Sequence, residues 1–124
     1  MSHSPPQILI VDDESTIREL LTRTLRHAGY NIHAAADGEI ALQYFQAHSF
    51  DLIITDLKMP RMDGEQLVQR VRAVAPDIPV LVLTGHGSVE AEERLRALGV
   101  SRVLYKPLKS LAELVSLVKQ LLNP

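Results

Sequence analysis

Polar side chains with chemical potential stand at the ends of four apolar runs in this sequence. The runs are Ile8–Val11, Leu52–Thr55, Val80–Leu83 and Val103–Tyr105, and they lead into Asp12-Asp13, Asp56, Thr84 and Lys106 respectively. These ends supply three carboxylates, one hydroxyl and one ammonium group. Two carboxylates ~4 Å apart repel by roughly 4 kcal/mol at an effective dielectric constant of 20, so such a cluster needs a cation or takes up protons.

The ligand types indicate which cation would suit this cluster. The chain has no cysteine, and its histidines (His3, His27, His33, His48 and His86) show no metal-ligand spacing, which argues against zinc. Oxygen ligands alone favour a hard cation, Mg²⁺, with Mn²⁺ as the alternative. Mg²⁺ usually takes one or two carboxylates plus a phosphate oxygen. With Lys106 as a movable positive charge and a carboxylate as nucleophile, the residues predict a site for a phosphoryl group.

The elements that must position these groups alternate along the chain. The four runs lack polar alternation, as is typical of strands covered on both faces, and Asn31–Ala35 predicts a weaker edge strand. Helical spacing predicts helices at 17–28, from Asp37-Gly38 through Phe45, from Gly64 to Pro76, from Ser88 to Gly99, and from Ser110 to Leu122. Strict alternation predicts a doubly wound α/β fold with a parallel sheet, in which ligands bind beyond the carboxyl ends of the strands.

Length and composition bound the function further. A chain of 124 residues, 46% hydrophobic and 23% charged, is expected to form one domain that needs no disulfide cross-links. The net charge of −2 gives no sign of direct nucleic acid contact or of an anionic membrane surface, and no apolar run of ~18 residues predicts a membrane span. We expect a disordered lead-in over 1–6, one folded domain over 7–124 and a cytoplasmic location.

Four motifs together resemble the receiver domain of two-component response regulators. They are Ile8-Leu-Ile-Val-Asp-Asp-Glu14, Asp56-Leu-Lys-Met-Pro-Arg-Met-Asp-Gly64, Leu83-Thr84 and Lys106-Pro107, each at or after its own strand. The resemblance covers the chain from about Gln7 to Leu122. It implies a flavodoxin-like (βα)5 fold with five parallel strands in the order 2-1-3-4-5.

The resemblance also implies a role for each matching residue. Asp56 would be the phosphoacceptor, served by a phosphohistidine on a sensor histidine kinase or histidine phosphotransfer protein. Asp12, Asp13, Asp56 and the backbone carbonyl of Lys58 would hold Mg²⁺, and Thr84 and Lys106 would contact phosphate oxygens. Thr84 and Tyr105 match the switch positions, and the bond before Pro107 is expected to be cis. The domain would signal rather than catalyse turnover, apart from its own phosphorylation and dephosphorylation.

Several residues carry a weaker expectation. Lys58 and His86 lie two residues beyond Asp56 and Thr84, where they could modulate phosphate lifetime from the rim. Asp12 or Asp13 could instead cap a helix, and Asp63 reads as a turn or cap residue. Gly85-His-Gly87 lacks the pattern of a dinucleotide-binding loop.

Two other functions stay open on the sequence. One is a phosphorylation-independent interaction module on the same fold. The other is a Mg²⁺-dependent aspartyl phosphohydrolase, which usually needs an acid where this chain has Lys58.

The expected signal runs through the helix at 88–99. Its few apolar anchors are chiefly Val89, Leu95 and Leu98, which makes it a plausible bistable element. Phosphate on Asp56 would draw in Thr84, Tyr105 would follow, and the surface of the fourth helix, fifth strand and fifth helix would change. That surface would meet an output domain, a target protein or a second copy in a phosphorylation-dependent homodimer.

Overall fold

Five short apolar segments form one parallel sheet in the computed structural model, which describes residues 4–123. The strands are β1 (Gln7–Val11), β2 (Asn31–Ala35), β3 (Leu52–Thr55), β4 (Val80–Thr84) and β5 (Arg102–Tyr105). Their order is β2-β1-β3-β4-β5, and every neighbouring pair is parallel. The predicted doubly wound sheet of order 2-1-3-4-5 is therefore confirmed, with Asn31–Ala35 at an edge.

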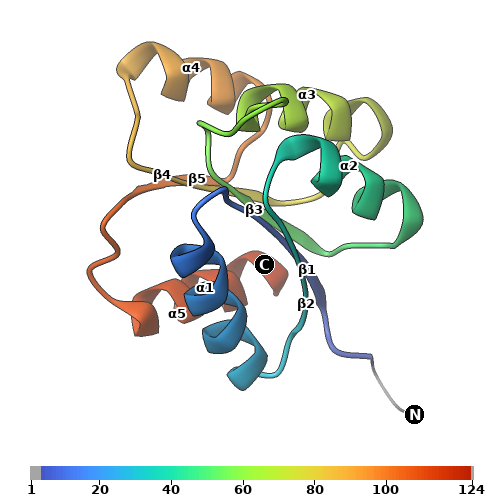
Figure 1. The fold of residues 1–124 in the computed structure, drawn as a ribbon, viewed down its shortest axis with the longest axis vertical. Coiled ribbons are helices and arrows are strands. Elements are labelled where there is room, and N and C mark those ends of the chain that lie inside the picture. Colours follow the sequence, from blue (N-terminus) through green and yellow to red (C-terminus); the bar gives the residue numbers. More distant parts are fainter. Residues whose placement is uncertain (1–3, 124) are drawn as a thin grey trace.

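Five helices cover the two faces of this sheet. They are α1 (Ser15–His27), α2 (Gly38–Ala47), α3 (Gly64–Val74), α4 (Val89–Ala97) and α5 (Leu111–Leu122). Helices α1 and α5 lie on one face, and α2, α3 and α4 lie on the other (Figure 1). None of the helices over 4–123 is long and apolar enough to cross a lipid bilayer.

Side chains that alternate along each strand divide the core into two layers. In β1, Ile8 and Ile10 pack with the residues of α1 and α5, whereas Leu9 and Val11 pack with those of α2, α3 and α4. All four of these side chains are at most 1% exposed. Burial on both faces explains why the strand reads as an unbroken apolar run.

Side-chain caps fix where four of the helices begin. Asp37, Asp63, Ser88 and Ser110 each accept a hydrogen bond from the backbone N–H three residues later. Each bond satisfies one of the N–H groups that a helix leaves free in its first turn. The predicted starts of α2, α4 and α5 and the capping role of Asp63 are confirmed. The N-cap position of α1 is Glu14, whose side chain makes no capping bond, so the alternative in which Asp12 or Asp13 caps this helix is contradicted.

Two predictions of burial are also wrong. The run Val103–Tyr105 was expected to be covered on both faces, but β5 is an edge strand in which Val103 and Leu104 are only half-buried and Tyr105 is 47% exposed. Val89 was expected to anchor α4 but is 68% exposed, because Ala91 and Leu95 face the core instead.

The lead-in predicted over 1–6 is described only in part. Residues 1–3 lie outside the described part of the chain. The carbonyl of Pro6 accepts a hydrogen bond from the N–H of Asn31 at 3.0 Å, which ties the chain to the start of β2.

Candidate functional site

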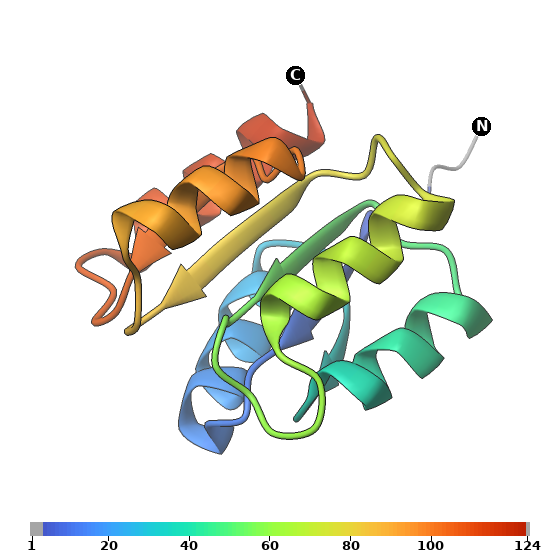
Figure 2. The ribbon, with the colours of Figure 1, turned by 90° about the horizontal axis from the view of Figure 1, so that it is seen from above.

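The parallel sheet places the carboxyl ends of its strands at one edge of the molecule. Figure 2 shows the strand arrows pointing toward that edge, where the loops to the helices begin. Val11 pairs with Thr55 in register, and the N–H of Asp56 donates to the carbonyl of Val11 at 2.9 Å. Pairing at the ends of β1 and β3 therefore brings Asp12 beside Asp56.

The other half of the site comes from β4 and β5. Thr84 pairs in register with Tyr105, and the N–H of Lys106 donates to the carbonyl of Thr84 at 2.9 Å. The peptide bond between Lys106 and Pro107 is cis, as the family resemblance predicted. The pairing of β4 with β5 places the start of the Lys106 side chain next to Thr84, on the site edge of the sheet.

Lys106 joins three carboxylates through its ammonium group. Its Nζ lies 2.8 Å from Asp12 Oδ2, 2.8 Å from Asp56 Oδ2 and 2.8 Å from Glu14 Oε1. Asp12 is 2% exposed and Asp56 is 4% exposed, while the Lys106 side chain is 12% exposed. An ammonium has three N–H donors, so all of its donor capacity is used by these carboxylates.

Burial and hydrogen bonding in this cluster shift the pKa values of Lys106 and Asp12. Burial alone would lower the pKa of the Lys106 ammonium, but its hydrogen bonds to Asp12, Asp56 and Glu14 outweigh burial and hold the pKa well above its usual range. Burial raises the pKa of the Asp12 carboxyl, more than the bonds from Lys106 and from the Glu14 N–H lower it. The site therefore holds a net anionic, partly desolvated group that a further cation would stabilise.

Three of the carboxylates are close enough to share one cation. Asp12, Asp13 and Asp56 each offer an oxygen, and these oxygens all lie within 4.8 Å of one another. Opposite ligands of an octahedral Mg²⁺ are about 4 Å apart, so a hydrated ion fits this spacing. Asp12 and Asp56 are buried and Asp13 is exposed, so the cluster opens to solvent on the Asp13 side.

The loop from β3 to α3 turns tightly around Asp56. Asp56 Oδ1 accepts the N–H of Leu57 at 2.6 Å, and the N–H of Gly64 donates to the carbonyl of Leu57 at 2.9 Å. A Cβ at Gly64 would lie 2.0 Å from the carbonyl oxygen of Asp56. Only glycine fits this approach, which keeps the start of α3 against the acceptor residue.

The residues expected at the rim lie together on the α4 side of Asp56. Lys58 and His86 both line a groove of about 460 Å³ between the β3–α3 loop and the start of α4. The side chain of Thr84 is fully buried at the end of β4, and its Oγ accepts the N–H of His86 at 3.0 Å.

Tyr105 points away from the carboxylates of Asp12, Asp13 and Asp56. Its hydroxyl hydrogen-bonds to the Glu92 carboxylate on α4, and its ring lies against Gly87, where a Cβ would be 2.2 Å from a ring carbon. The aromatic side chain of β5 is thus held on the surface by the helix that is expected to move.

Sequence reasoning missed two contacts around the site. Glu14 was part of the first motif but received no role, although it is the third partner of Lys106. Asp37 was expected only to open α2, but its second oxygen pairs with Arg61 of the β3–α3 loop. The acidic run that includes Glu14 was a usable signal for the first contact, whereas the pair of Asp37 and Arg61 joins distant segments and left no local pattern.

Comparison with known proteins gives the same assignment as the motifs. A family model described as the response regulator receiver domain matches residues 8–119. The chain is 38% identical over 107 residues to the transcriptional regulatory protein GlrR of Escherichia coli, covering 86% of this chain and 24% of that protein. It is 38% identical over 121 residues to the response regulator MprA of Mycolicibacterium vanbaalenii, covering 96% of this chain and 51% of that protein.

Solved structures agree with the sequence relatives. A CheY-like receiver domain protein from Methanospirillum hungatei superposes with a TM-score of 0.93 at 28% identity, covering 97% of this chain and 95% of that one. The chemotaxis protein CheY4 of Vibrio cholerae gives 0.88 at 35% identity, covering 94% and 98%. The chain spans a quarter to a half of the length of the curated relatives above. From its fold, its motifs and the family match over 8–119, the chain belongs to the response regulator receiver domain family.

Proposed function

We propose that this domain accepts a phosphoryl group on Asp56 from a phosphohistidine and converts its presence into a change of surface. The observation that carries the proposal is the nearly buried Asp56 carboxylate, held at 2.8 Å by the Lys106 ammonium among further acids. A histidine kinase or histidine phosphotransfer protein would be the donor. In the reaction, an oxygen of Asp56 forms a bond to phosphorus, the phosphorus–nitrogen bond breaks, and the imidazole leaves with the electron pair.

Positioning and charge neutralisation supply most of what phosphoryl transfer needs, so no general base is required at this site. Lys106 would turn from the Asp56 carboxylate to a phosphoryl oxygen without leaving the pocket, because its other partners flank the same position. The buried hydroxyl of Thr84 is placed to donate to a second phosphoryl oxygen once its side chain turns toward Asp56.

Asp12, Asp13, Asp56 and the backbone carbonyl of Lys58 would hold Mg²⁺, and Mn²⁺ has the same ligand preference. The spacing of the three carboxylates supports this assignment. The metal would supply positive charge against the phosphoryl oxygens. The exposed position of Asp13 leaves the donor a route to the site from solvent.

The response would pass from Thr84 to Tyr105. A short charge-assisted bond from the Thr84 hydroxyl to the phosphoryl group would draw the β4–α4 loop inward. Tyr105 would then leave Glu92 and move in behind Thr84, which releases one tie between β5 and α4. We infer a coupling of about 1–3 kcal/mol between phosphate and this movement, so both forms would be populated.

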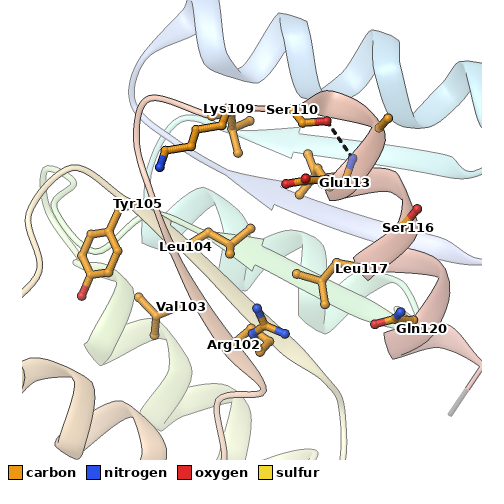
Figure 3. A pocket seen from close by; sticks show the side chains of 13 residues that line it. Arg102, Val103, Leu104, Tyr105, Lys109, Ser110, Glu113, Ser116, Leu117 and Gln120 are labelled. Atoms are coloured by element: carbon orange, nitrogen blue, oxygen red, sulfur yellow. Dashed lines mark hydrogen bonds between the residues drawn. The ribbon is translucent and has the colours of Figure 1, made fainter.

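The surface that changes would be that of α4, β5 and α5. A groove of about 600 Å³ lies between β5 and α5, and Figure 3 shows Leu104 and Leu117 facing each other across it while Tyr105 points away. Half-buried apolar side chains on an edge strand suit a partner surface. The partner would be an output domain, a target protein or a second copy in a phosphorylation-dependent homodimer. Some relatives are described as transcriptional regulatory proteins, which supports a regulatory output. The predicted cytoplasmic location stays a prediction.

The alternatives differ in what they do with phosphate. An interaction module independent of phosphorylation would not use the complete set of Asp12, Asp13, Asp56, Thr84 and Lys106. A phosphohydrolase would turn over a generic phosphate ester such as p-nitrophenyl phosphate, and Lys58 stands where its acid is expected.

The test uses phosphoramidate, a small donor with the same phosphorus–nitrogen bond. Incubation with Mg²⁺ should raise the intact mass of the wild type by one phosphoryl group and leave Asp56→Asn unchanged. Asp51→Asn is the matched control, because Asp51 is an exposed aspartate immediately before β3. Equal uptake by the wild type and Asp56→Asn would contradict the proposal.

A further inference from the structure

Two segments of the proposed metal site are tied to the same short turn. The turn between β2 and α2, here called the brace, comprises Ala35–Gly38. On one side, the N–H of Asp12 donates to the carbonyl of Ala35 at 3.1 Å. On the other side, the N–H of Gly38 donates to the carbonyl of Met62 in the β3–α3 loop at 3.2 Å. The brace therefore spans from the loop that carries Asp12 to the loop that carries Lys58.

A side-chain pair fastens the brace to the β3–α3 loop. Asp37 is 1% exposed, and its Oδ1 caps α2 by accepting the N–H of Ile40 at 2.9 Å. Its Oδ2 is left for the Arg61 guanidinium, which makes an ion pair with it. Although burial alone would raise the pKa of the Asp37 carboxyl, the bonds from Ile40 and Arg61 outweigh it and hold that pKa below its usual range.

The backbone conformation at Arg61 and the close approach at Gly38 support this attachment of the brace to the β3–α3 loop. Arg61 has φ of 68°, the left-handed region that side chains other than glycine rarely adopt. A Cβ at Gly38 would lie 2.5 Å from the carbonyl oxygen of Met62, so the loop and the start of α2 are in direct backbone contact. An unfavourable conformation at Arg61 persists only where surrounding contacts hold it, and the pair with Asp37 is such a contact.

We propose that Asp37 and Arg61 are positioning residues for the proposed metal site, acting by holding the β3–α3 loop that carries the Lys58 carbonyl. The inference rests on the proposed function, because it assigns a further role around the same Mg²⁺ site. Neither side chain is among the proposed metal ligands. Residues that orient the ligands of a metal commonly change its affinity by about 10-fold when replaced.

The sign of the effect separates this role from simple electrostatics. Arg61 is a cation in the loop that carries a proposed Mg²⁺ ligand, so removal of its charge alone would, if it had any effect, strengthen Mg²⁺ binding. Loss of the fastening would instead weaken Mg²⁺ binding, because the carbonyl ligand would no longer be held in place. A weaker site in an Arg61 variant therefore identifies positioning.

The experiment compares Arg61→Gly and Asp37→Asn with the wild type by Mg²⁺ titration, followed through backbone amide chemical shifts. Glycine accepts the left-handed backbone at position 61, and asparagine keeps the cap of α2, so both variants should fold. Each should bind Mg²⁺ about 10-fold more weakly, and the double variant should be no weaker than the single ones. The free energies of unfolding of these variants, measured by urea titration, should not rank in the same order as their Mg²⁺ affinities.

Charge-matched controls complete the design. Arg70→Ala removes an exposed arginine from α3, and Glu93→Gln removes an exposed carboxylate from α4. Both should leave Mg²⁺ affinity close to that of the wild type. Wild-type affinity in Arg61→Gly or in Asp37→Asn would overturn the inference. Absence of Mg²⁺ binding by the wild type would instead contradict the proposed function.

Discussion

Replacing Lys106 by methionine tests whether this one ammonium holds the carboxylate cluster together. Methionine matches the lysine side chain out to Cε and removes the charged ammonium group. In the wild type, Nζ lies 2.8 Å from both Asp12 and Asp56, which are 2% and 4% exposed. The variant would leave two buried carboxylates facing each other without a cation between them.

The magnitude follows from opposing contributions. Each 2.8 Å contact is worth roughly 6 kcal/mol at an effective dielectric constant of 20, before desolvation of the ammonium and repulsion between the carboxylates are subtracted. Loss of one partner from a buried ion pair typically costs about 3–5 kcal/mol. Because Glu14 and Asp13 open one side of the site to water, we expect about 3 kcal/mol at neutral pH, or about 10 °C in Tm.

Urea unfolding of Lys106→Met at neutral pH measures this loss, with Lys109→Met, an exposed lysine nearby in the chain, as the control. Added Mg²⁺ should stabilise Lys106→Met more than the wild type, because it would neutralise the same carboxylates. The loss should shrink as the pH falls, since burial already favours the protonated Asp12. A loss below about 1 kcal/mol, as for an exposed ion pair, would refute this account of Lys106.

Three further changes have distinct expected results. Gly64→Ala should lower the free energy of unfolding by about 3 kcal/mol in a urea titration, because its Cβ would lie 2.0 Å from the Asp56 carbonyl oxygen. Thr84→Ala should still take up phosphate but should show smaller amide shifts over 89–98 with beryllofluoride; full shifts there would exclude Thr84 as the relay. Burial, together with the nearby charges of His48 and Arg26, lowers the pKa of His33. The free energy of unfolding of the wild type should therefore decrease as the pH is lowered from about 7 to about 5. His33→Phe should reduce this pH dependence in urea titrations at the two pH values.

The sequence predicted the architecture well because buried parallel strands leave a direct trace in it. Runs such as Ile8–Val11 are apolar at every position, and each predicted strand agrees with the structure within about two residues. The strand ends then placed Asp12, Asp56 and Lys106 on one edge without any knowledge of distances. Three of the helix starts were predictable for a similar reason, since Asp37, Ser88 and Ser110 act within three residues of themselves.

The errors and omissions arose where the outcome depends on neighbours distant in sequence. Val103–Tyr105 looks like the other apolar runs, but β5 has a strand on one side only and is incompletely covered. Val89 begins its helix on the solvent side, which helical spacing alone did not separate from the core side. The partnership of Asp37 with Arg61 joins residues 24 positions apart and depends on how two loops meet.

Locating the phosphoryl group tests the central claim most directly. Borohydride reduces an aspartyl phosphate to homoserine, so reduction after incubation with phosphoramidate and Mg²⁺ marks the acceptor permanently. Peptide mass spectrometry should then find homoserine at position 56 alone, and omission of Mg²⁺ should strongly reduce its yield. Homoserine at position 12 or 13, or a phosphoryl group retained on a histidine, would contradict the assignment of Asp56 as the acceptor.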